Sequence, residues 1–425
     1  MLIEFTVGNF LSFKEPVTLS MVATALKDLG GGNTFPATNK LSLLKSAVVY
    51  GANASGKSNL FNAMSFMRYF VRTSSTEMQV DEEIDVDSFL LNTETEEKPS
   101  SFEIIFLHEG IRYRYGFKVD RKKVHEEWLF SLETTKEAEL FGRIGNSIAV
   151  GGKFKEGKKL EDKTRENVLF LSVVAQFNGE TSKKILQWFS SSMGIVSGLS
   201  DHLYGSFTLD KLEDNNFKKK LLELLKVADV GIDEIKHEVV EASDEILPKD
   251  MPKKLRNRLL KDKAKMIEVV CLHKKYNEQN KPVASIGFEL EECESQGTKK
   301  LFFLSGLLFE ALKEGRVLII DEFDSRFHPL LSRKIVELFH SEETNPRNAQ
   351  LLIATHDTSL MTKERYRRDQ IWFVEKSQYG ASDLFALSDY KMNVRNDASF
   401  SKDYMLGKYG AIPSLGDFKE LFGER

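Results

Sequence analysis

The chain has 425 residues, and its 60 Lys and Arg against 64 Asp and Glu give a formal charge of −4. Hydrophobic residues make up 41% of the chain and 31 residues are Phe, which is enough apolar side chain to offset the entropy cost of ordering it. This composition excludes an intrinsically disordered protein, and two cysteines are too few for a disulfide scaffold.

The N-terminus and the longest apolar runs indicate the cellular compartment. The N-terminus carries an acid at once and lacks the basic segment of a secretory signal. No apolar run reaches the ~20 residues that a membrane helix needs. We therefore expect a cytoplasmic protein of two or three domains.

The first third of the chain predicts strands around one helix. Residues 2–13 alternate apolar and polar side chains, which predicts an opening strand, and residues 47–50 form a short buried strand. Apolar residues at helical spacing predict a helix over 59–70. Further on we expect an acidic loop over 81–100, strands over 101–107, 111–119 and 125–132, and a surface loop over 142–166.

After residue 166 the chain shows a short apolar segment, then a helical pattern, and then alternating strands and helices. The apolar segment 169–175 predicts a strand that ends at Gln176, and residues 180–265 have the pattern of helices. Strands and helices then alternate, which is typical of a largely parallel sheet. The expected elements are strands at 266–272, 317–320 and 351–354, and helices at 299–312 and 329–339.

A complete G-x-x-x-x-G-K-S motif spans Gly51 to Ser58, between the buried strand and the helix, which is the context this motif requires. Its glycines let backbone N–H groups face phosphate oxygens, and the helix N-terminus adds partial positive charge. Lys57 can reach the β- and γ-phosphates and Ser58 can ligate Mg²⁺. The residues predicted to bind the nucleotide are Gly51, Asn53, Ala54, Ser55, Gly56, Lys57, Ser58 and Asn59.

Polar residues follow two later strands. Asp321 and Glu322 end an apolar strand, so we expect Asp321 to hold Mg²⁺ opposite Ser58 and Glu322 to polarise the attacking water. His356 ends the next strand, where a histidine can sense the γ-phosphate. The alternatives are solvated strand ends and an ordinary core or surface histidine.

Ser295 and Gly297 stand just before the apolar helix at 299–312. A small-residue turn at a helix N-terminus favours an anion site. The same residues also suit a plain helix N-cap, and the two interpretations are about equal in isolation.

In this order, the motifs resemble those of ABC-type ATPase heads. A P-loop, a glutamine, Ser-x-Gly before a helix, Asp-Glu and a histidine follow one another as in those heads, and residues 9–13 look like the first strand of SMC-like and RecF-like heads. The tail from Asp403 to Pro413 is similar to that of AAA/ABC ATPases of prokaryotic abortive-infection and anti-phage systems, of the AbiL/RloA kind, to which AriA and PtuA are related.

The resemblance implies an α/β fold, a P-loop ABC-ATPase head with a mixed sheet and an inserted helical region. The lobes would be residues 1–179 and 266–425, with the insertion at 180–265. Gln176 resembles the Q-loop residue that couples Mg²⁺ to the insertion and thereby takes part in catalysis. Ser295-Gln296-Gly297 resembles a signature motif that departs from Leu-Ser-Gly-Gly-Gln and acts on the nucleotide of the facing protomer.

The function that this implies is an ATPase switch with ATP and Mg²⁺ as cofactors. Two heads would pair around ATP in a homo-oligomer that is at least a dimer, and would control a separate effector protein such as a nuclease. The rival is a RecF/SMC-like DNA repair or recombination ATPase, for which no sustained heptads of a coiled-coil arm are present. A transporter ATPase is a third interpretation.

A basic stretch, Lys253 to Lys265, carries seven basic residues and one acid. It indicates either contact with nucleic acid or an acidic partner, or a solvated helix face. Only 69 residues follow His356, so we do not expect a nuclease domain after the head of the kind found in OLD proteins.

Overall fold

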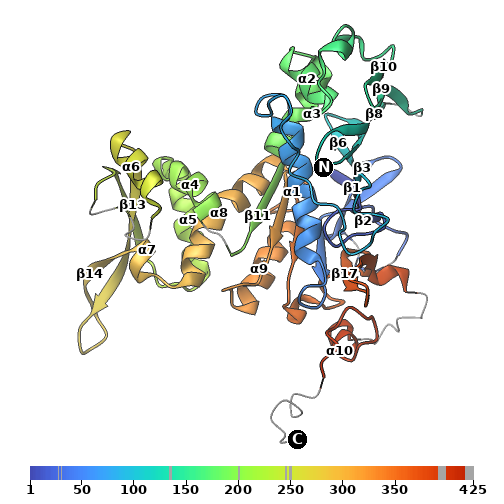
Figure 1. Ribbon diagram of the computed structural model, residues 1–425. Coiled ribbons are helices and arrows are strands. Elements are labelled where there is room, and N and C mark those ends of the chain that lie inside the picture. The colour runs from blue at the N-terminus through green and yellow to red at the C-terminus, as the bar shows by residue number, and fades with distance from the viewer. Residues whose placement is uncertain are drawn as a thin grey trace, which may run out of the picture. The chain divides into compact units, whose positions relative to one another are not determined.

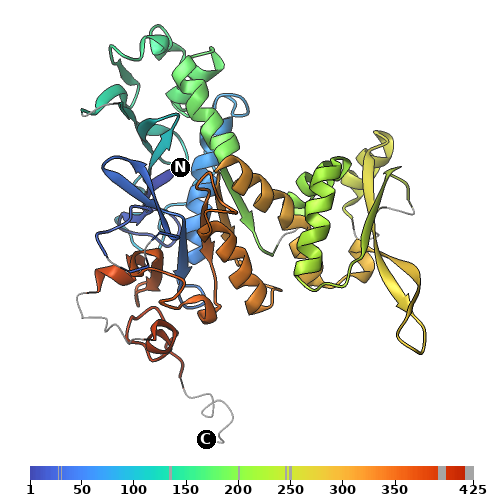
Figure 2. The same cartoon turned by 180° about the vertical axis from the view of Figure 1, so that it is seen from behind.

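The computed structural model describes residues 1–26, 28–29, 31–133, 136–199, 202–244, 247, 251–390 and 399–416 (Figures 1 and 2). The chain divides into two compact units. The first comprises residues 1–198, 310–325 and 332–425, and the second comprises residues 199–309 and 326–331.

The core of the first unit is a six-stranded sheet in the order β11-β15-β16-β5-β17-β18. The first five of these strands are parallel, and β18 is antiparallel to β17. The apolar runs of β5, β15 and β16 are buried almost throughout, as expected for parallel strands covered on both faces. The bounds are β5 (Ser46–Tyr50), β11 (Met193–Ser197), β15 (Val317–Asp321), β16 (Gln350–Ala354), β17 (Ile371–Lys376) and β18 (Ser382–Ala386).

A second, antiparallel sheet of the same unit has the order β10-β9-β8-β7-β6-β1-β2. Its central strands β6, β7 and β8 confirm the strands predicted at 101–107, 111–119 and 125–132, and Glu109 and Gly110 both take positive φ in the turn between β6 and β7. The bounds are β1 (Leu2–Gly8), β2 (Val17–Ser20), β6 (Ser100–His108), β7 (Ile111–Val119), β8 (Val124–Leu132), β9 (Ala138–Ile144) and β10 (Ser147–Val150). A small hairpin, β3 (Thr34–Thr38) and β4 (Leu41–Leu44), lies outside this sheet.

Helix α1 (Lys57–Thr73) lies between the two sheets. Phe66 and Phe70 pack against Phe102 and Phe117 of the antiparallel sheet, with ring centroids 4.9 and 5.6 Å apart. Other apolar residues of the helix, such as Leu60, share one buried cluster with the core strands. The helix predicted at 59–70 is therefore confirmed, and it joins both layers of the unit.

Three local predictions are wrong. The opening strand stops at Gly8, because Asn9 and Leu11 take positive φ and leave the extended conformation. Much of the loop predicted at 142–166 is instead part of β9, all of β10 and the short 3₁₀ helices η1 (Lys155–Gly157) and η2 (Glu161–Lys163). The apolar segment before Gln176 is not a strand but helix α2 (Phe170–Gln176), because a short buried run looks alike in either conformation.

Further helices complete the first unit. Helix α3 (Glu180–Gln187) and a π-helical turn, η3 (Trp188–Ser192), follow α2. The 3₁₀ helices η5 (Thr358–Leu360), η6 (Arg368–Gln370) and η7 (Leu387–Asp389) flank the last strands. Helix α9 (Pro329–His340), most of which belongs to this unit, starts at its proline as predicted.

The second unit is not purely helical. Its three-stranded antiparallel sheet has the order β12-β13-β14, so a strand lies within the predicted helical segment 180–265, and β13 and β14 extend the unit beyond residue 265. Its elements are α4 (His202–Asp210), η4 (Lys211–Glu213), α5 (Asn215–Val227), β12 (Glu234–Glu241), α6 (Lys253–Lys261), β13 (Lys265–Tyr276), β14 (Pro282–Glu289), α7 (Leu290–Cys293) and most of α8 (Gln296–Glu314).

The C-terminal segment packs directly onto the core sheet. Helix α10 (Phe400–Met405) stacks Tyr404 on Phe373 of β17, with ring centroids 5.3 Å apart. The backbone N–H of Ala411 donates to Glu375 Oε1 at 2.9 Å. The tail that carried the family resemblance is therefore an ordered cover on β17, the neighbour of strand β5.

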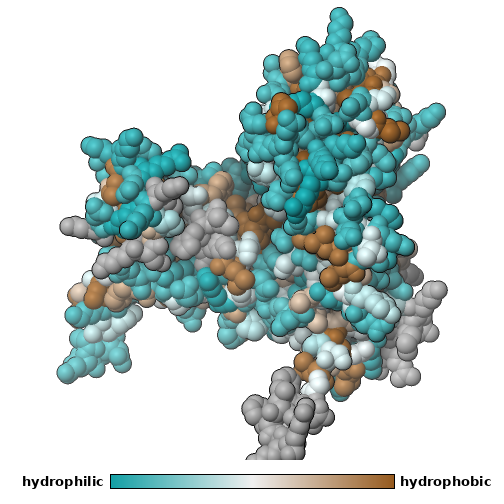
Figure 3. All heavy atoms as spheres, in the orientation of Figure 1, coloured by the Kyte–Doolittle hydropathy of each residue, from teal (hydrophilic) through white to brown (hydrophobic). Residues whose placement is uncertain are grey.

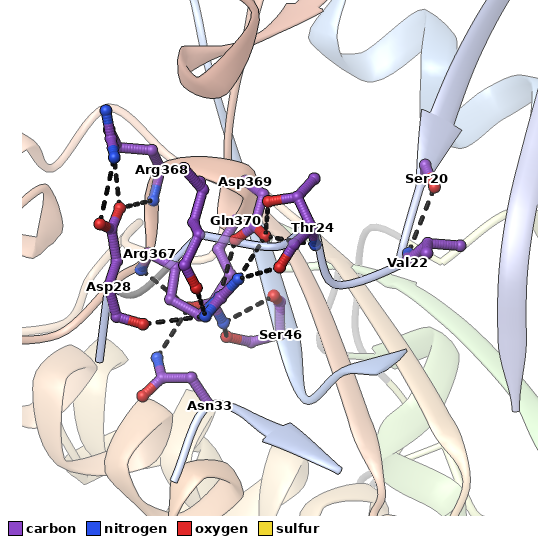
Figure 4. Close-up of polar contacts among 11 residues, drawn as sticks. Ser20, Val22, Thr24, Asp28, Asn33, Ser46, Arg367, Arg368, Asp369 and Gln370 are labelled. Atoms are coloured by element: carbon purple, nitrogen blue, oxygen red, sulfur yellow. Dashed lines mark hydrogen bonds and ion pairs between the residues drawn. The ribbon is translucent and has the colours of Figure 1, made fainter. Parts of the chain in front are cut away.

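A buried polar network ties the N-terminal segment to the residues that precede β17 (Figure 4). Arg367 pairs with Asp369 through two hydrogen bonds of 2.9 and 2.7 Å, and both residues are at most 5% exposed. Asp369 also accepts from the backbone and hydroxyl of Thr24. Gln370 donates to the Ser46 carbonyl at 2.9 Å, which fixes the start of β17 beside the start of β5.

The surface in Figure 3 is mostly hydrophilic, with hydrophobic residues in separate small patches. Among the residues described, no helix has both the length and the hydropathy required to cross a membrane.

Candidate functional site: a phosphate-binding pocket

The P-loop leads from β5 into α1 and depends on glycine at its last turn. Gly56 has φ 114°, a conformation that L side chains rarely adopt. A Cβ on Gly56 would lie 2.5 Å from Ser382 Oγ and 2.6 Å from Ser12 Oγ. Two serines from distant segments therefore close around this turn and leave no room for any other residue.

The loop forms one side of a cavity of about 440 Å³. Glu322 and His356, which follow β15 and β16, and Lys376 at the end of β17 also line it. The parallel strands bring these three residues to one edge of the sheet, where ligands of open α/β sheets bind. The P-loop residues in the lining are Asn53, Ala54, Ser55, Gly56, Lys57, Ser58 and Asn59.

Lys57 is buried and folds back along the loop. Its Nζ donates to the carbonyls of Gly51 and Ala52 at 2.9 and 3.1 Å. Burial lowers the pKa of Lys57, while the nearby carboxylates of Glu322, Asp321 and Asp324 act in the opposite direction. The amine of Lys57 thus lies at the pocket near these three acids. A bound phosphate could replace the two backbone carbonyls as its hydrogen-bond acceptor.

The acids predicted to act on the nucleotide lie at the turn after β15. Asp321 Oδ1 accepts from the backbone N–H of Glu322 at 3.0 Å, and Glu322 takes φ 51°. The side chain of Glu322 lines the pocket, whereas Asp321 lies beside it. Asp324 Oδ1 accepts from the backbone N–H of His356 at 3.2 Å, which ties the ends of β15 and β16 together.

Ser58 and Asp321 are suited to Mg²⁺. A hydroxyl and a carboxylate are hard oxygen ligands, and protein-bound Mg²⁺ commonly combines one or two carboxylates with substrate phosphates. Within the described ranges no group of three or more His, Cys, Asp or Glu forms a metal site by itself. A Mg²⁺ ion held by Ser58 and Asp321 would therefore be shared with the phosphates of the nucleotide.

The structure does not bring Gln176 to this pocket. Gln176 is exposed at the end of α2. That helix packs on the carboxyl end of α1, where Ser172 Oγ donates to the Val71 carbonyl at 2.6 Å. The P-loop lies at the other end of α1, roughly 25 Å away at 1.5 Å per residue over 17 residues. The expected contact of Gln176 with Mg²⁺ is therefore absent from this arrangement.

Ser295 and Gly297 lie in the second unit, at the start of α8. Ser295 Oγ accepts from the backbone N–H of Thr298 at 3.1 Å, which is the geometry of a helix N-cap. Both Ser295 and Gln296 are exposed. Ser295 is thus the N-cap of α8, and because it is exposed its hydroxyl can also contact a ligand.

The basic stretch is partly neutralised within its own unit. Arg256 donates to Asp244 and to the Leu247 carbonyl, and Arg258 lies 3.7 Å from Asp262. Lys253 and Lys261 are exposed on α6. Contact of this helix with nucleic acid stays a prediction that rests on a few exposed lysines.

Sequence reasoning missed Ser12, Ser382 and Lys376. Ser12 lies within residues 9–13, for which only a strand was predicted, and neither Ser382 nor Lys376 belongs to a short motif. Each of the three reaches the P-loop pocket from a segment far away in the chain. The only available signal was that Lys376 ends a strand after the His356 segment, where another neighbour of the P-loop strand is expected.

A family profile described as "AAA domain, putative AbiEii toxin, Type IV TA system" matches residues 46–362, about three quarters of the chain. The chain belongs to this AAA domain family. The profile covers the P-loop, Asp321, Glu322 and His356, so the pocket of this AAA protein is built mostly from the family's matched region. Lys376 and Ser382 lie beyond it. Among curated proteins, none matches the sequence.

Solved structures of ATPase heads are similar to this AAA protein. The SMC head domain from Thermotoga maritima is 13% identical with a TM-score of 0.39, over 91% of this chain and 98% of that one. An Smc head domain with a coiled coil and joint from Pyrococcus yayanosii is 12% identical with a TM-score of 0.37, over 91% and 96%. The recombination mediator protein RecF with ATP is 14% identical with a TM-score of 0.31, over 91% and 99%. These scores are low, so the function is argued from the residues of this chain.

Proposed function

We propose that this AAA protein binds ATP with Mg²⁺ in the P-loop pocket and hydrolyses it to ADP and phosphate. The observation that carries the proposal is the convergence of Lys57, Glu322 and His356 on one cavity from three segments of the chain. A buried amine that can hold phosphate, a carboxylate that can act on water and a histidine at the rim are the groups that phosphoryl transfer to water requires.

In this proposal each residue has one role. The N–H groups of the P-loop and the amine of Lys57 hold the phosphate chain and orient the γ-phosphate. Glu322 accepts a hydrogen bond from the attacking water and polarises it. His356 donates a hydrogen bond to the γ-phosphate. Ser58 and Asp321 would hold Mg²⁺, which would supply positive charge to neutralise the phosphate oxygens.

We further propose that ATP is shared between two copies of the chain. Ser295 and Gly297 of one copy would contact the nucleotide on the other, so the pair would be stable only while the γ-phosphate is present. A ligand shifts an equilibrium only through differential contacts with its two states, and hydrolysis removes such a contact. This switch would report to a separate effector.

The biological setting that we propose is prokaryotic anti-phage defence by abortive infection, with the chain as the switch subunit of the AbiL/RloA kind. The family description names a putative AbiEii toxin of a Type IV toxin–antitoxin system, and the sequence of the tail from Asp403 to Pro413 resembles the tails of those defence ATPases. Gln176 has no part in this assignment, because it lies at the far end of α1.

The second candidate function is DNA repair or recombination of the RecF/SMC type. The exposed lysines of α6 favour it, since lysines on one helix can neutralise DNA phosphates. The two candidates differ in what the ATP-bound protein captures, which is duplex DNA in one case and the product of a neighbouring gene in the other.

The proposed activity is tested by phosphate release from ATP with Mg²⁺, using the purified full-length chain. We expect Lys57→Ala to abolish turnover and Glu322→Gln to reduce it by at least a hundredfold while ATP binding persists. Glu343→Gln, which changes an exposed acid in the loop after α9, is the matched control and should turn over ATP at the parent rate. Undiminished turnover by Lys57→Ala would refute the assignment.

A further inference from the structure

Lys376 ends β17 on the side of the sheet that faces the P-loop. Side chains alternate along a strand, so Lys376 shares its face with Trp372 and Val374. Those two residues belong to the same buried cluster as Leu60 and other apolar residues of α1. Glu375 lies on the opposite face, where it accepts from the backbone of Ala411. The alternation therefore directs Lys376 to the face that carries α1 and its phosphate loop.

The register of the β17–β18 hairpin places Lys376 beside a residue that touches the P-loop. Lys376 pairs with Ser382 across the two strands, and directly opposed residues have Cβ atoms about 4.5–5.5 Å apart. Ser382 Oγ donates to the Ser55 carbonyl at 2.5 Å, and its backbone N–H donates to the Ser12 carbonyl at 2.7 Å. The hairpin is thus fastened to the loop at the position next to Lys376.

The amine of Lys376 is exposed in the pocket that also contains Lys57. No hydrogen bond or ion pair connects it to any residue that the structure describes. Lysine is a strongly hydrated point charge on a flexible stem, and its partners in binding sites are phosphate oxygens and carboxylates. A free cation at the rim of a phosphate loop has an evident anionic partner in the phosphate chain of the nucleotide.

We propose that Lys376 is a second phosphate-binding lysine of this pocket, and that Ser382 is the residue that positions it. The inference rests on the proposed function of the pocket and adds to it a contact that no sequence motif marks. Lys57 approaches the phosphates from the start of α1, whereas Lys376 approaches from the end of β17. The phosphate chain is therefore held between two cations, one at the start of the helix that follows β5 and one at the end of the neighbouring parallel strand β17.

The test measures ATP affinity by calorimetry with Mg²⁺, in the Glu322→Gln background so that ATP persists. A hydrogen bond to a charged group corresponds to a ten- to hundredfold change in affinity. We expect Lys376→Met to weaken ATP binding by that factor and Lys376→Arg to stay within about threefold of the parent. Lys40→Met, at the exposed turn between β3 and β4, is the matched control and should bind like the parent.

A second set of variants separates positioning from folding. Ser382→Ala should weaken ATP binding as well, and the double variant with Lys376→Met should lose less than the product of the two single losses, because both act through one contact. The thermal unfolding midpoint without nucleotide should be unchanged in Lys376→Met.

The outcomes distinguish this inference from the proposed function. ATP binding within twofold of the parent by Lys376→Met would overturn the role of Lys376 alone. A loss of affinity that comes with a lower unfolding midpoint and that Lys376→Arg does not restore would also overturn it. If the parent itself binds no ATP, the proposed function of the pocket fails first.

Discussion

Replacing Asp369 with Ala tests the buried network that anchors β17 beside the P-loop strand. Asp369 accepts four hydrogen bonds, two from Arg367 and two from Thr24, at 2.7–2.9 Å. The change leaves the guanidinium of Arg367 buried, with backbone carbonyls as its remaining partners. Breaking a buried ion pair by removing one partner costs about 3–5 kcal/mol, so we expect the free energy of unfolding of the first unit to fall by that amount.

Tryptophan fluorescence in a urea titration is the appropriate assay. Trp128, Trp188 and Trp372 are the three tryptophans of the chain, and all belong to the first unit, so the signal follows that unit alone. Lys334→Ala removes an exposed ion pair with Glu337 and serves as control, with an expected loss of less than about 1 kcal/mol. A loss below about 1 kcal/mol for Asp369→Ala would refute the argument that this network anchors β17.

Two further predictions follow from the pocket and from the buried histidine of α9. Gly56→Ala should abolish ATP binding, because the new Cβ would collide with Ser12 and Ser382 and the residue would have to keep a positive φ. Calorimetry measures the ATP affinity, and Gly416→Ala, where a Cβ would meet no other atom, is the control. An affinity of Gly56→Ala equal to that of the parent would contradict the reasoning. Burial lowers the pKa of His340 from 6.5 to about 4. Between these pH values His340 is protonated in the unfolded chain but neutral in the folded one. The free energy of unfolding therefore falls as the pH falls, by at most about 1.4 kcal/mol per pH unit. In His340→Gln the urea midpoint should decline less between pH 6.5 and 4.5 than in the parent, and equal declines would show that His340 does not titrate in this way.

The site residues that could be predicted from the sequence are those whose positions depend on local structure. The P-loop is a strand, a turn and a helix start within a dozen residues, so Gly56, Lys57 and Ser58 can be recognised from that local pattern. Asp321, Glu322 and His356 follow short buried strands, and the rule that parallel strands end at one edge of a sheet is sufficient to bring the last two into one cavity.

The features that could not be predicted from the sequence are those that tertiary contacts determine. Residues 169–175 are apolar apart from Ser172, and only their packing on the end of α1 decides that they form a helix and carry Gln176 away from the pocket. Leu11 leaves the strand conformation while its N–H donates to the Asp87 carbonyl, 76 residues further along the chain. Lys376 is placed by the register of a hairpin, which periodicity alone does not give.

The mass of the Glu322→Gln chain in solution, with and without ATP and Mg²⁺, tests most directly whether ATP is held between two copies. Without nucleotide we expect the 48.5 kDa chain at a lower oligomeric state than with it. Adding Ser295→Ala should reverse the ATP-dependent increase in mass while calorimetry still detects ATP bound to each chain. A mass that does not change when ATP is bound would contradict the shared-nucleotide switch.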